Sequence, residues 1–269
     1  MLRPHEFARH ATLARYPCAP ELDPWVENYW SVRWDLPSGR SWPSATLPHP
    51  ACNLSVEHGQ ARPGVGPGPV VTGVVTRRFE VLLRDRGWVF GAKFRPGGLT
   101  SLTGVPARVL RDATVPAAEV VPAAVAAVLR TLGPEASDET CREAYDVAWA
   151  GTAQRPDPSY GLVLDVVAAM LGDRELQRVA QVEQRCGLSA RRLQRLFATY
   201  VGVSPKWVLA RYRMHDAVSD LDAGYDGSLA DLAARYGWFD QAHFTREFTR
   251  LIGASPGTYL QESLGRAEP

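Results

Sequence analysis

Cysteine is sparse in this chain of 269 residues, and its four cysteines lie far apart without a Cys-x-x-Cys pair. This spacing argues against cysteine-based zinc sites and disulfide frames, and it favours reduced thiols in a cytoplasm. The chain also lacks a run of about 18 apolar residues, the length that a membrane-spanning helix needs. Residues 1–10 lack the apolar core of a secretory signal. We therefore expect a cytoplasmic protein that crosses no membrane.

An excess of charge of one sign is also missing, because 30 Lys and Arg residues oppose 29 Asp and Glu residues. A uniformly basic nucleic-acid coat and an acidic disordered tail are therefore excluded. The charges are nevertheless uneven: residues 174–213 contain nine basic and two acidic residues, whereas residues 216–231 contain five aspartates and no basic residue. A local basic cluster on a near-neutral protein fits a DNA-facing surface. Chance arginines on a solvated helix are the alternative.

The first half of the chain has the pattern of strands and the second half the pattern of helices. After a proline-rich, irregular start over 1–24, short apolar runs predict strands over 25–35, 45–57, 70–76, 79–84 and 88–94. Residues 59–69 predict a loop, and helical patterns follow over 116–133 and 137–150. We expect four parts: a β-rich domain (1–115), a helical pair (116–150), a linker (151–159) and an all-helical domain (160–269).

The helical half contains an internal repeat. Residues 187–205 (GLSARRLQRLFATYVGVSP) align with residues 237–256 (GWFDQAHFTREFTRLIGASP), so that Phe197 falls on Phe248 and Pro205 on Pro256. The offset between the copies is 50 before the turn and 51 after it, so the second turn holds one extra residue. A match of this length indicates a duplicated supersecondary unit.

Each copy has the pattern of a helix-turn-helix. A short helix, about 178–185 or 229–236, ends at a glycine that can adopt the left-handed conformation, and Ser189 or Asp240 is the expected cap of the next helix. Apolar residues of that second helix are spaced to pack inward: Leu193, Leu196, Phe197, Phe244, Phe248 and Leu251. Its polar face is expected to bind DNA through Arg191, Arg192, Gln194, Arg195, Gln241, His243, Thr245 and Arg246. Arginine and glutamine suit base edges in the major groove, although ordinary hairpins with solvated faces are the alternative.

A continuous helix is predicted between the copies, because residues 206–221 contain no proline or glycine. Its length of about 24 Å, with the offsets of the two hairpins, suits major-groove segments about 34 Å apart. Its acidic end (Asp216, Asp220, Asp222) is expected to point away from phosphates. A helix that serves only for packing is the alternative.

Two segments resemble signatures of the AraC/XylS family of bacterial transcription regulators: Arg211-x-Arg213-Met214-x-x-Ala217, and Gly237-Trp238-x-Asp240-Gln241-x-His243-Phe244-x-Arg246-x-Phe248 with Gly253-x-Ser255-Pro256. The resemblance covers about residues 160–260. It implies two helix-turn-helix units on one long helix, a double-stranded promoter as partner and RNA polymerase as a further partner. By family position, Arg191, Gln194 and Arg195 read bases in the first unit, and Gln241, His243 and Arg246 in the second. One departure is Glu183, where the family has a small alanine, as at Ala233; it should loosen the packing or pair with an arginine.

The first half resembles, over residues 46–59 and 73–98, a poorly characterised regulatory domain that precedes such DNA-binding domains. We therefore expect an α+β chain with a barrel-like, cupin-like N-terminal domain and flanking helices. The β-rich part (1–115) is expected to sense a small molecule or to form a homodimer, and the helical pair (116–150) to take part in dimerisation. Candidate ligand residues are Trp30, Trp34, His49, Lys93 and Arg95. The aromatic residues suit an apolar pocket and the two cations an anionic effector, whereas an aromatic core and a solvated strand are the alternatives.

No metal or other cofactor is expected. His49, Cys52 and His58 have the right side chains for metal binding, but their spacing matches no standard zinc site, and an apolar strand should keep the Cys52 thiol inert. The sequence thus favours an effector-responsive transcription regulator with no catalytic residues. A constitutive regulator whose first domain only dimerises is the main alternative. A metal-dependent barrel enzyme fused to a DNA-binding domain is disfavoured, because no His-x-His or His-Glu-x-x-His occurs.

Overall fold

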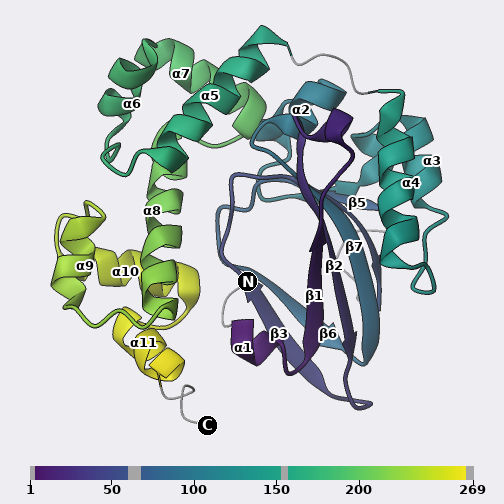
Figure 1. Ribbon diagram of the computed structural model, residues 1–269, viewed down its shortest axis with the longest axis horizontal. Coiled ribbons are helices and arrows are strands. Elements are labelled where there is room, and N and C mark those ends of the chain that lie inside the picture. Colours follow the sequence, from purple (N-terminus) through teal and green to yellow (C-terminus); the bar gives the residue numbers. More distant parts are fainter. Residues whose placement is uncertain (1–3, 60–67, 153–156, 265–269) are drawn as a thin grey trace.

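A computed structural model describes residues 4–59, 68–152 and 157–264. The molecule has a β-rich N-terminal lobe and a helical C-terminal lobe (Figure 1). The strands are β1 (Ala11–Tyr16), β2 (Val26–Asp35), β3 (Ser41–Thr46), β4 (Asn53–His58), β5 (Val70–Thr72), β6 (Phe79–Arg84), β7 (Arg86–Phe94) and β8 (Thr114–Pro116). The N-terminal lobe also contains the helices α1 (Pro4–Phe7), α2 (Gly98–Thr103), α3 (Ala123–Leu129) and α4 (Asp138–Ala150).

The strands form an open sheet, so the expected barrel is wrong. Six strands pair in the order β1-β2-β7-β4-β5-β8, and β3 pairs with β6 in a separate ribbon. A barrel closes only when each strand is paired on both sides. Among the described residues β1 and β8 remain the two edges of the larger sheet, without pairing to each other or to the ribbon. The fold is therefore α+β with an open antiparallel sheet.

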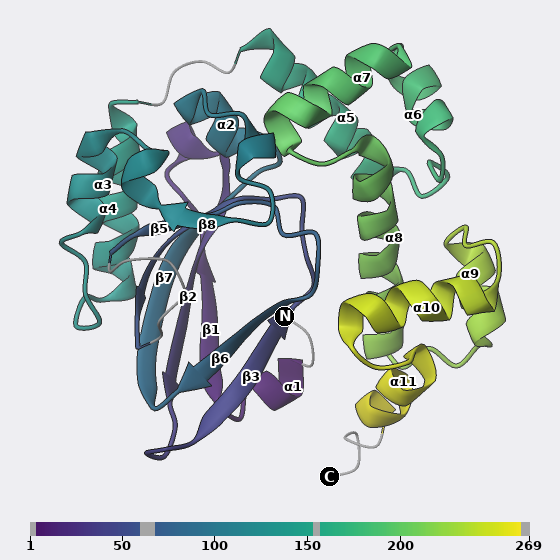
Figure 2. The same cartoon turned by 180° about the vertical axis from the view of Figure 1, so that it is seen from behind.

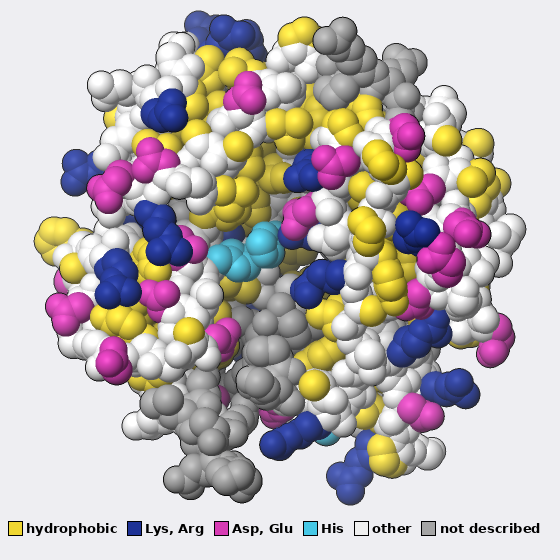
Figure 3. Space-filling model, in the orientation of Figure 1, with side chains coloured by type: hydrophobic (Ala, Val, Ile, Leu, Met, Phe, Trp, Pro, Cys, Tyr) yellow, Lys and Arg dark blue, Asp and Glu magenta, His cyan; other side chains and the backbone are white. Residues whose placement is uncertain are grey.

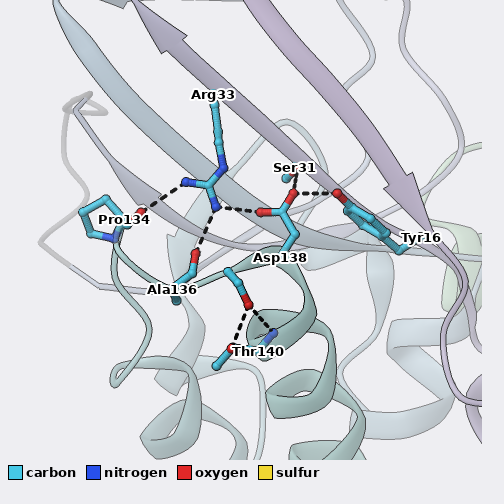
Figure 4. Close-up of polar contacts among 8 residues, drawn as sticks. Tyr16, Ser31, Arg33, Pro134, Ala136, Asp138 and Thr140 are labelled. Carbon is cyan, nitrogen blue, oxygen red and sulfur yellow. Dashed lines mark hydrogen bonds and ion pairs between the residues drawn. The ribbon is translucent and has the colours of Figure 1, made fainter.

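Helix α4 covers one face of this sheet and is held there by carboxylates. Its residues Cys141, Tyr145 and Trp149, one turn apart, are fully buried. At its start the Asp138 carboxylate accepts hydrogen bonds from Tyr16 Oη at 2.7 Å, Ser31 Oγ at 2.5 Å and an Arg33 nitrogen at 2.7 Å (Figure 4). The helices expected to carry a dimer contact thus belong, by their apolar face, to the core of the N-terminal lobe.

The C-terminal lobe consists of helices stacked along one long helix (Figure 2). They are α5 (Pro158–Gly172), α6 (Val179–Cys186), α7 (Ala190–Leu196, continued by a π-helical turn, Phe197–Val201), α8 (Pro205–Asp222), α9 (Leu229–Arg235), α10 (Gln241–Ile252) and α11 (Pro256–Leu264). Helices α5 to α7 and the first part of α8 share a hydrophobic core with the sheet. The second part of α8 and helices α9 to α11 have their own core, to which Ala45 and Leu47 of the N-terminal lobe contribute.

Several local predictions from the sequence are wrong. The start of the chain contains α1 and β1 instead of an irregular segment, and α2 and β8 were not predicted. The strand expected over 45–57 is two strands, because Pro48 and Pro50 interrupt it and proline has no N–H to donate to a sheet. Most of the loop expected over 59–69 lies outside the described residues. Among the described helices, none is both long and apolar enough to cross a bilayer.

Candidate nucleic-acid interface

The two predicted turns have the expected geometry. Gly187 and Gly237 adopt left-handed conformations with φ of 63° and 72°. The Ser189 hydroxyl accepts the backbone N–H of Arg192 at 3.4 Å, and the Asp240 carboxylate accepts that of His243 at 2.6 Å. Both caps therefore fix the first turn of the helix that follows, α7 in the first unit and α10 in the second.

The second helix of each unit has a buried face and an exposed face. All six residues expected to pack inward are buried. Of the eight expected to bind DNA, His243 and Thr245 are half-buried, and six are exposed: Arg191, Arg192, Gln194, Arg195, Gln241 and Arg246. Within the described part of the chain, the guanidinium groups of these four arginines form no hydrogen bond or ion pair. They are available to phosphates or bases.

Helix α8 joins the two units as one rod of 18 residues, capped by Ser204. The Arg213 guanidinium ties this helix to the second turn, because it donates to Gly237 O at 3.1 Å and lies 5.3 Å from the Trp238 ring. The Trp238 indole in turn donates to Glu247 of α10 at 2.7 Å. The position of α10 on the rod is thereby fixed by polar contacts as well as by packing.

The burial of Arg211, two positions earlier, was not predicted from the sequence. This residue is only 3% exposed, and its Nε and Nη1 atoms are buried without a hydrogen-bond partner. Its guanidinium lies 4.6 Å from the ring of Trp207, one helical turn away. Burial, with the nearby charge of Arg250, lowers the pKa of Arg211 to about 10. The Trp207-x-x-x-Arg211 spacing was the available signal for this stacked pair.

The aspartates at the end of α8 hold neighbouring helices. Asp220 accepts a hydrogen bond from Tyr236 Oη at 2.8 Å and pairs with Arg235 at 3.2 Å, and Asp222 accepts one from Tyr259 Oη at 2.8 Å. Glu183 is half-buried within an intact α6 and forms no ion pair among the described residues, so of the two effects expected of it the pairing with an arginine is not found.

The five candidate ligand residues of the N-terminal lobe do not form one constellation. Trp34 is buried and lines a cavity of about 650 Å³, whose lining does not include the other four. Trp30 donates to Asn53. Lys93 pairs with Glu27 at 2.6 Å, and Arg95 with Asp23 at 2.8 Å. Both cations therefore have carboxylate partners.

His49 faces the helical lobe instead of the other metal-binding residue types of its own lobe. Its ring centre lies 3.9 Å from that of His215 on α8, and His215 is also hydrogen-bonded to Pro48 O at 3.1 Å. Cys52 is buried, which raises the pKa of its thiol to about 12. Among the described residues there is no group of three or more His, Cys, Asp or Glu side chains that could hold a metal ion.

Comparison with known proteins matches the two lobes separately. Residues 14–116 match the family described as "Domain of unknown function (DUF6597)", and residues 182–262 match that described as "Helix-turn-helix domain". The HTH-type transcriptional regulator Rv1931c of Mycobacterium tuberculosis is 33% identical over 82 residues, 30% of this chain. The chain covers 31% of that regulator's length.

Crystal structures of ToxT from Vibrio cholerae have a loosely similar overall arrangement. The 1.65 Å structure has a TM-score of 0.41 at 10% identity, over 93% of this chain and 98% of the other. The structure of ToxT with a bound unsaturated fatty acid has a TM-score of 0.40 at 10% identity, over 96% and 97%. Likeness at this level carries no argument about this chain. The sequence matches are more informative: residues 182–262 match a helix-turn-helix domain family and resemble a transcriptional regulator, in agreement with the resemblance of this segment to AraC/XylS regulators, and the chain joins this domain to a β-rich N-terminal domain.

Proposed function

We propose that the chain is a sequence-specific transcription regulator that binds double-stranded promoter DNA through both helix-turn-helix units. The observation that carries this proposal is the duplicated exposed face, which contains four arginines without partners among the described residues. Three of them lie on α7 and one on α10, the two capped helices of the units that α8 joins. Arg191, Gln194 and Arg195 would read bases from the first unit, and Gln241, His243 and Arg246 from the second. Arg192 and Thr245 would complete the contact surface.

The N-terminal lobe is proposed to regulate this binding in response to a small molecule. The cavity of about 650 Å³ that Trp34 lines has a volume typical of small-molecule sites. The proposal keeps the expected division of the chain, with sensing in 1–115, a homodimer contact in 116–150, a linker in 151–159 and DNA binding in 160–269. Val147, 70% exposed on α4, supports the dimer contact. RNA polymerase would be a further partner, the setting would be the cytoplasm, and no reaction would be catalysed.

One observation favours the alternative of a constitutive regulator whose N-terminal lobe only dimerises. Trp25 and Tyr29 are buried in the hydrophobic core of the N-terminal lobe and do not line that cavity, so these two rings form an aromatic core and not an open aromatic pocket. The two readings differ in whether small molecules change DNA binding. Measurement of the affinity of the full chain for a promoter duplex, with and without added apolar acids, would distinguish the effector-responsive from the constitutive regulator.

The direct test selects duplexes from a random DNA library with the full chain and then measures affinity for the selected site. Arg195→Ala and Arg246→Ala should each weaken binding by about 1–3 kcal/mol and relax preference at one base pair. The matched control is Arg108→Ala, an exposed arginine of the N-terminal lobe, which should leave affinity unchanged. Equal loss on every sequence would reduce the two arginines to phosphate contacts, and failure to enrich any sequence would overturn the proposal.

A further inference from the structure

The two turns differ by one residue, and the structure identifies it as Phe239. Leu188 and Trp238 are both buried at the start of their turns, and Ser189 and Asp240 both cap the following helix. Phe239 is therefore the insertion between two otherwise equivalent pairs. It is 93% exposed, the highest value among the large exposed hydrophobic side chains of the described residues.

The turn holds Phe239 in a fixed position. On one side Trp238 is 5% exposed, with its indole bonded to Glu247 and the Arg213 guanidinium against its ring. On the other side the Asp240 carboxylate caps α10 at 2.6 Å. The aromatic ring is thus presented outward from an anchored backbone, directly before the cap residue of α10.

This position lies at the end of the helix that would enter the major groove, because recognition helices contact base edges with their N-terminal residues. The apolar group that a base pair presents in that groove is the C5 methyl of thymine. We propose that Phe239 is a specificity-determining residue that packs against a thymine methyl at the edge of the second unit's site. The inference rests on the proposed DNA-binding function and adds a contact that the first unit lacks.

A DNA partner fits the surroundings of Phe239 better than a protein partner does. The other large exposed hydrophobic side chains of the described residues lie elsewhere: Leu82 on β6, Val109 after the end of α2, Val147 on α4 and Leu171 on α5. None lies on α9 or α10, so Phe239 is the one large exposed hydrophobic side chain among the described residues of this unit, and it precedes the exposed Gln241 and Arg246 of α10. Protein interfaces have apolar, charge-depleted centres, whereas one ring among polar donors suits a groove rim with an isolated methyl group.

The experiment compares duplexes that differ only by that methyl group. Each thymine of the second unit's half of the selected site is replaced in turn by deoxyuridine, and wild type, Phe239→Ala and Phe239→Leu are measured on each duplex. For wild type, one replacement should weaken binding about fourfold, the equivalent of about 0.8 kcal/mol for one buried methyl. Phe239→Ala should bind the thymine duplex more weakly and lose this ratio, and Phe239→Leu should retain part of it. The salt dependence of DNA binding by Phe239→Ala should equal that of wild type, because the substitution removes no phosphate contact.

Two controls separate the possible causes. Leu171→Ala removes another exposed apolar side chain and should keep the wild-type ratio, as should deoxyuridine in the first unit's half of the site. The inference is overturned if Phe239→Ala keeps the wild-type thymine ratio. It is also overturned if that variant keeps DNA affinity but loses promoter activation, which would indicate a protein partner. A wild-type chain that enriches no DNA sequence would instead overturn the proposed function, and this inference with it.

Discussion

Arg211 and Arg213 lie two positions apart on α8, and their surroundings differ in kind. Arg213 donates to a backbone carbonyl and stacks on Trp238. Arg211 is buried more completely, and among the described residues its Nε and Nη1 have no hydrogen-bond partner, whereas Arg213 lacks one only at Nε. The favourable interactions of Arg211 are with the Trp207 ring and with the charge of Glu247. A buried cation without a hydrogen-bond acceptor is unfavourable for folding, and stacking on an aromatic ring offsets only part of that.

Replacement of the two arginines by methionine should therefore change stability in opposite directions. Arg211→Met keeps most of the packing volume and removes the desolvated charge, so it should raise the free energy of unfolding by roughly 1–2 kcal/mol. Arg213→Met removes a charged hydrogen bond to Gly237 O and should lower it by about 1–3 kcal/mol. Urea unfolding of the three chains measures both effects. A loss for Arg211→Met as large as that for Arg213→Met would mean that the Arg211 charge is compensated.

At the scale of elements, α4 shows how one carboxylate positions a helix on a sheet. Burial raises the pKa of the Asp138 carboxyl, but hydrogen bonds from Ser31, Tyr16 and Arg33 outweigh it and hold that pKa below its usual value. These donors lie on β1 and β2, so the interaction joins α4 to the edge of the sheet. The neighbouring Glu139 pairs with Arg142 on the same helix and joins no two elements.

Asp138→Ala should lower the free energy of unfolding by about 2–3 kcal/mol, because it leaves three donors without their acceptor. A carboxyl group whose pKa is lower in the folded than in the unfolded chain contributes stability that is fully present above the unfolded pKa. That contribution is lost as the pH falls through the folded pKa. The difference between wild type and Asp138→Ala should therefore shrink in acid. Glu139→Gln is the matched control one position away and should change little. Equal effects of the two substitutions, by urea unfolding at pH 7, would contradict the account.

The sequence predicted elements best where two independent signals coincided. The helical lobe combines periodic apolar positions with caps and a repeat, and α9 was expected over 229–236 and found at Leu229–Arg235. In the N-terminal lobe the periodic signal was often absent. Strand β1 has one buried residue, Ala11, and the separate pairing of β3 with β6 depends on contacts distant in the sequence. The barrel expectation failed for that reason, since pairing partners are not encoded in local pattern.

In the candidate site, too, features set by local spacing were predicted and features set by contacts distant in the sequence were not. The outward positions of Arg191, Arg195 and Arg246 followed from helical periodicity, because a residue's face is determined by its spacing from apolar neighbours. The partners of Lys93 and Arg95 did not follow, because Glu27 and Asp23 lie on another part of the fold. The burial of Arg211 was likewise invisible, since it depends on packing between helices.

At the scale of the whole molecule, the described residues of the two lobes contact each other in two regions. The Tyr160 hydroxyl of α5 donates to Pro24 O at 2.7 Å, and the first unit shares the core of the sheet. Below it, Ala45 and Leu47 pack into the core of the second unit, and His49 lies against His215. Figure 3 shows histidine side chains in the hollow between the two lobes. The second helix-turn-helix unit is therefore held against the N-terminal lobe by a contact that contains two titratable rings.

This contact should weaken in mild acid. Burial, with the nearby His215, lowers the pKa of His49 to about 2, and burial lowers that of His215 to about 4 even though its bond to Pro48 O opposes this. An exposed histidine has a pKa of about 6.5. Because the folded values are below the unfolded value, the unfolded chain binds more protons between about pH 6.5 and pH 4, and stability falls as the pH falls through that range.

From pH 7 to pH 5 the loss should be about 2 kcal/mol for each of the two histidines. In His215→Gln, whose amide can still donate to Pro48 O, the loss should be smaller by that amount, and His49→Gln/His215→Gln should lose both contributions. Urea unfolding of the three chains at the two pH values measures the difference. The same pH dependence in wild type and in the double variant would show that the histidines are solvated in the folded chain, and that this histidine contact does not hold the second unit against the N-terminal lobe.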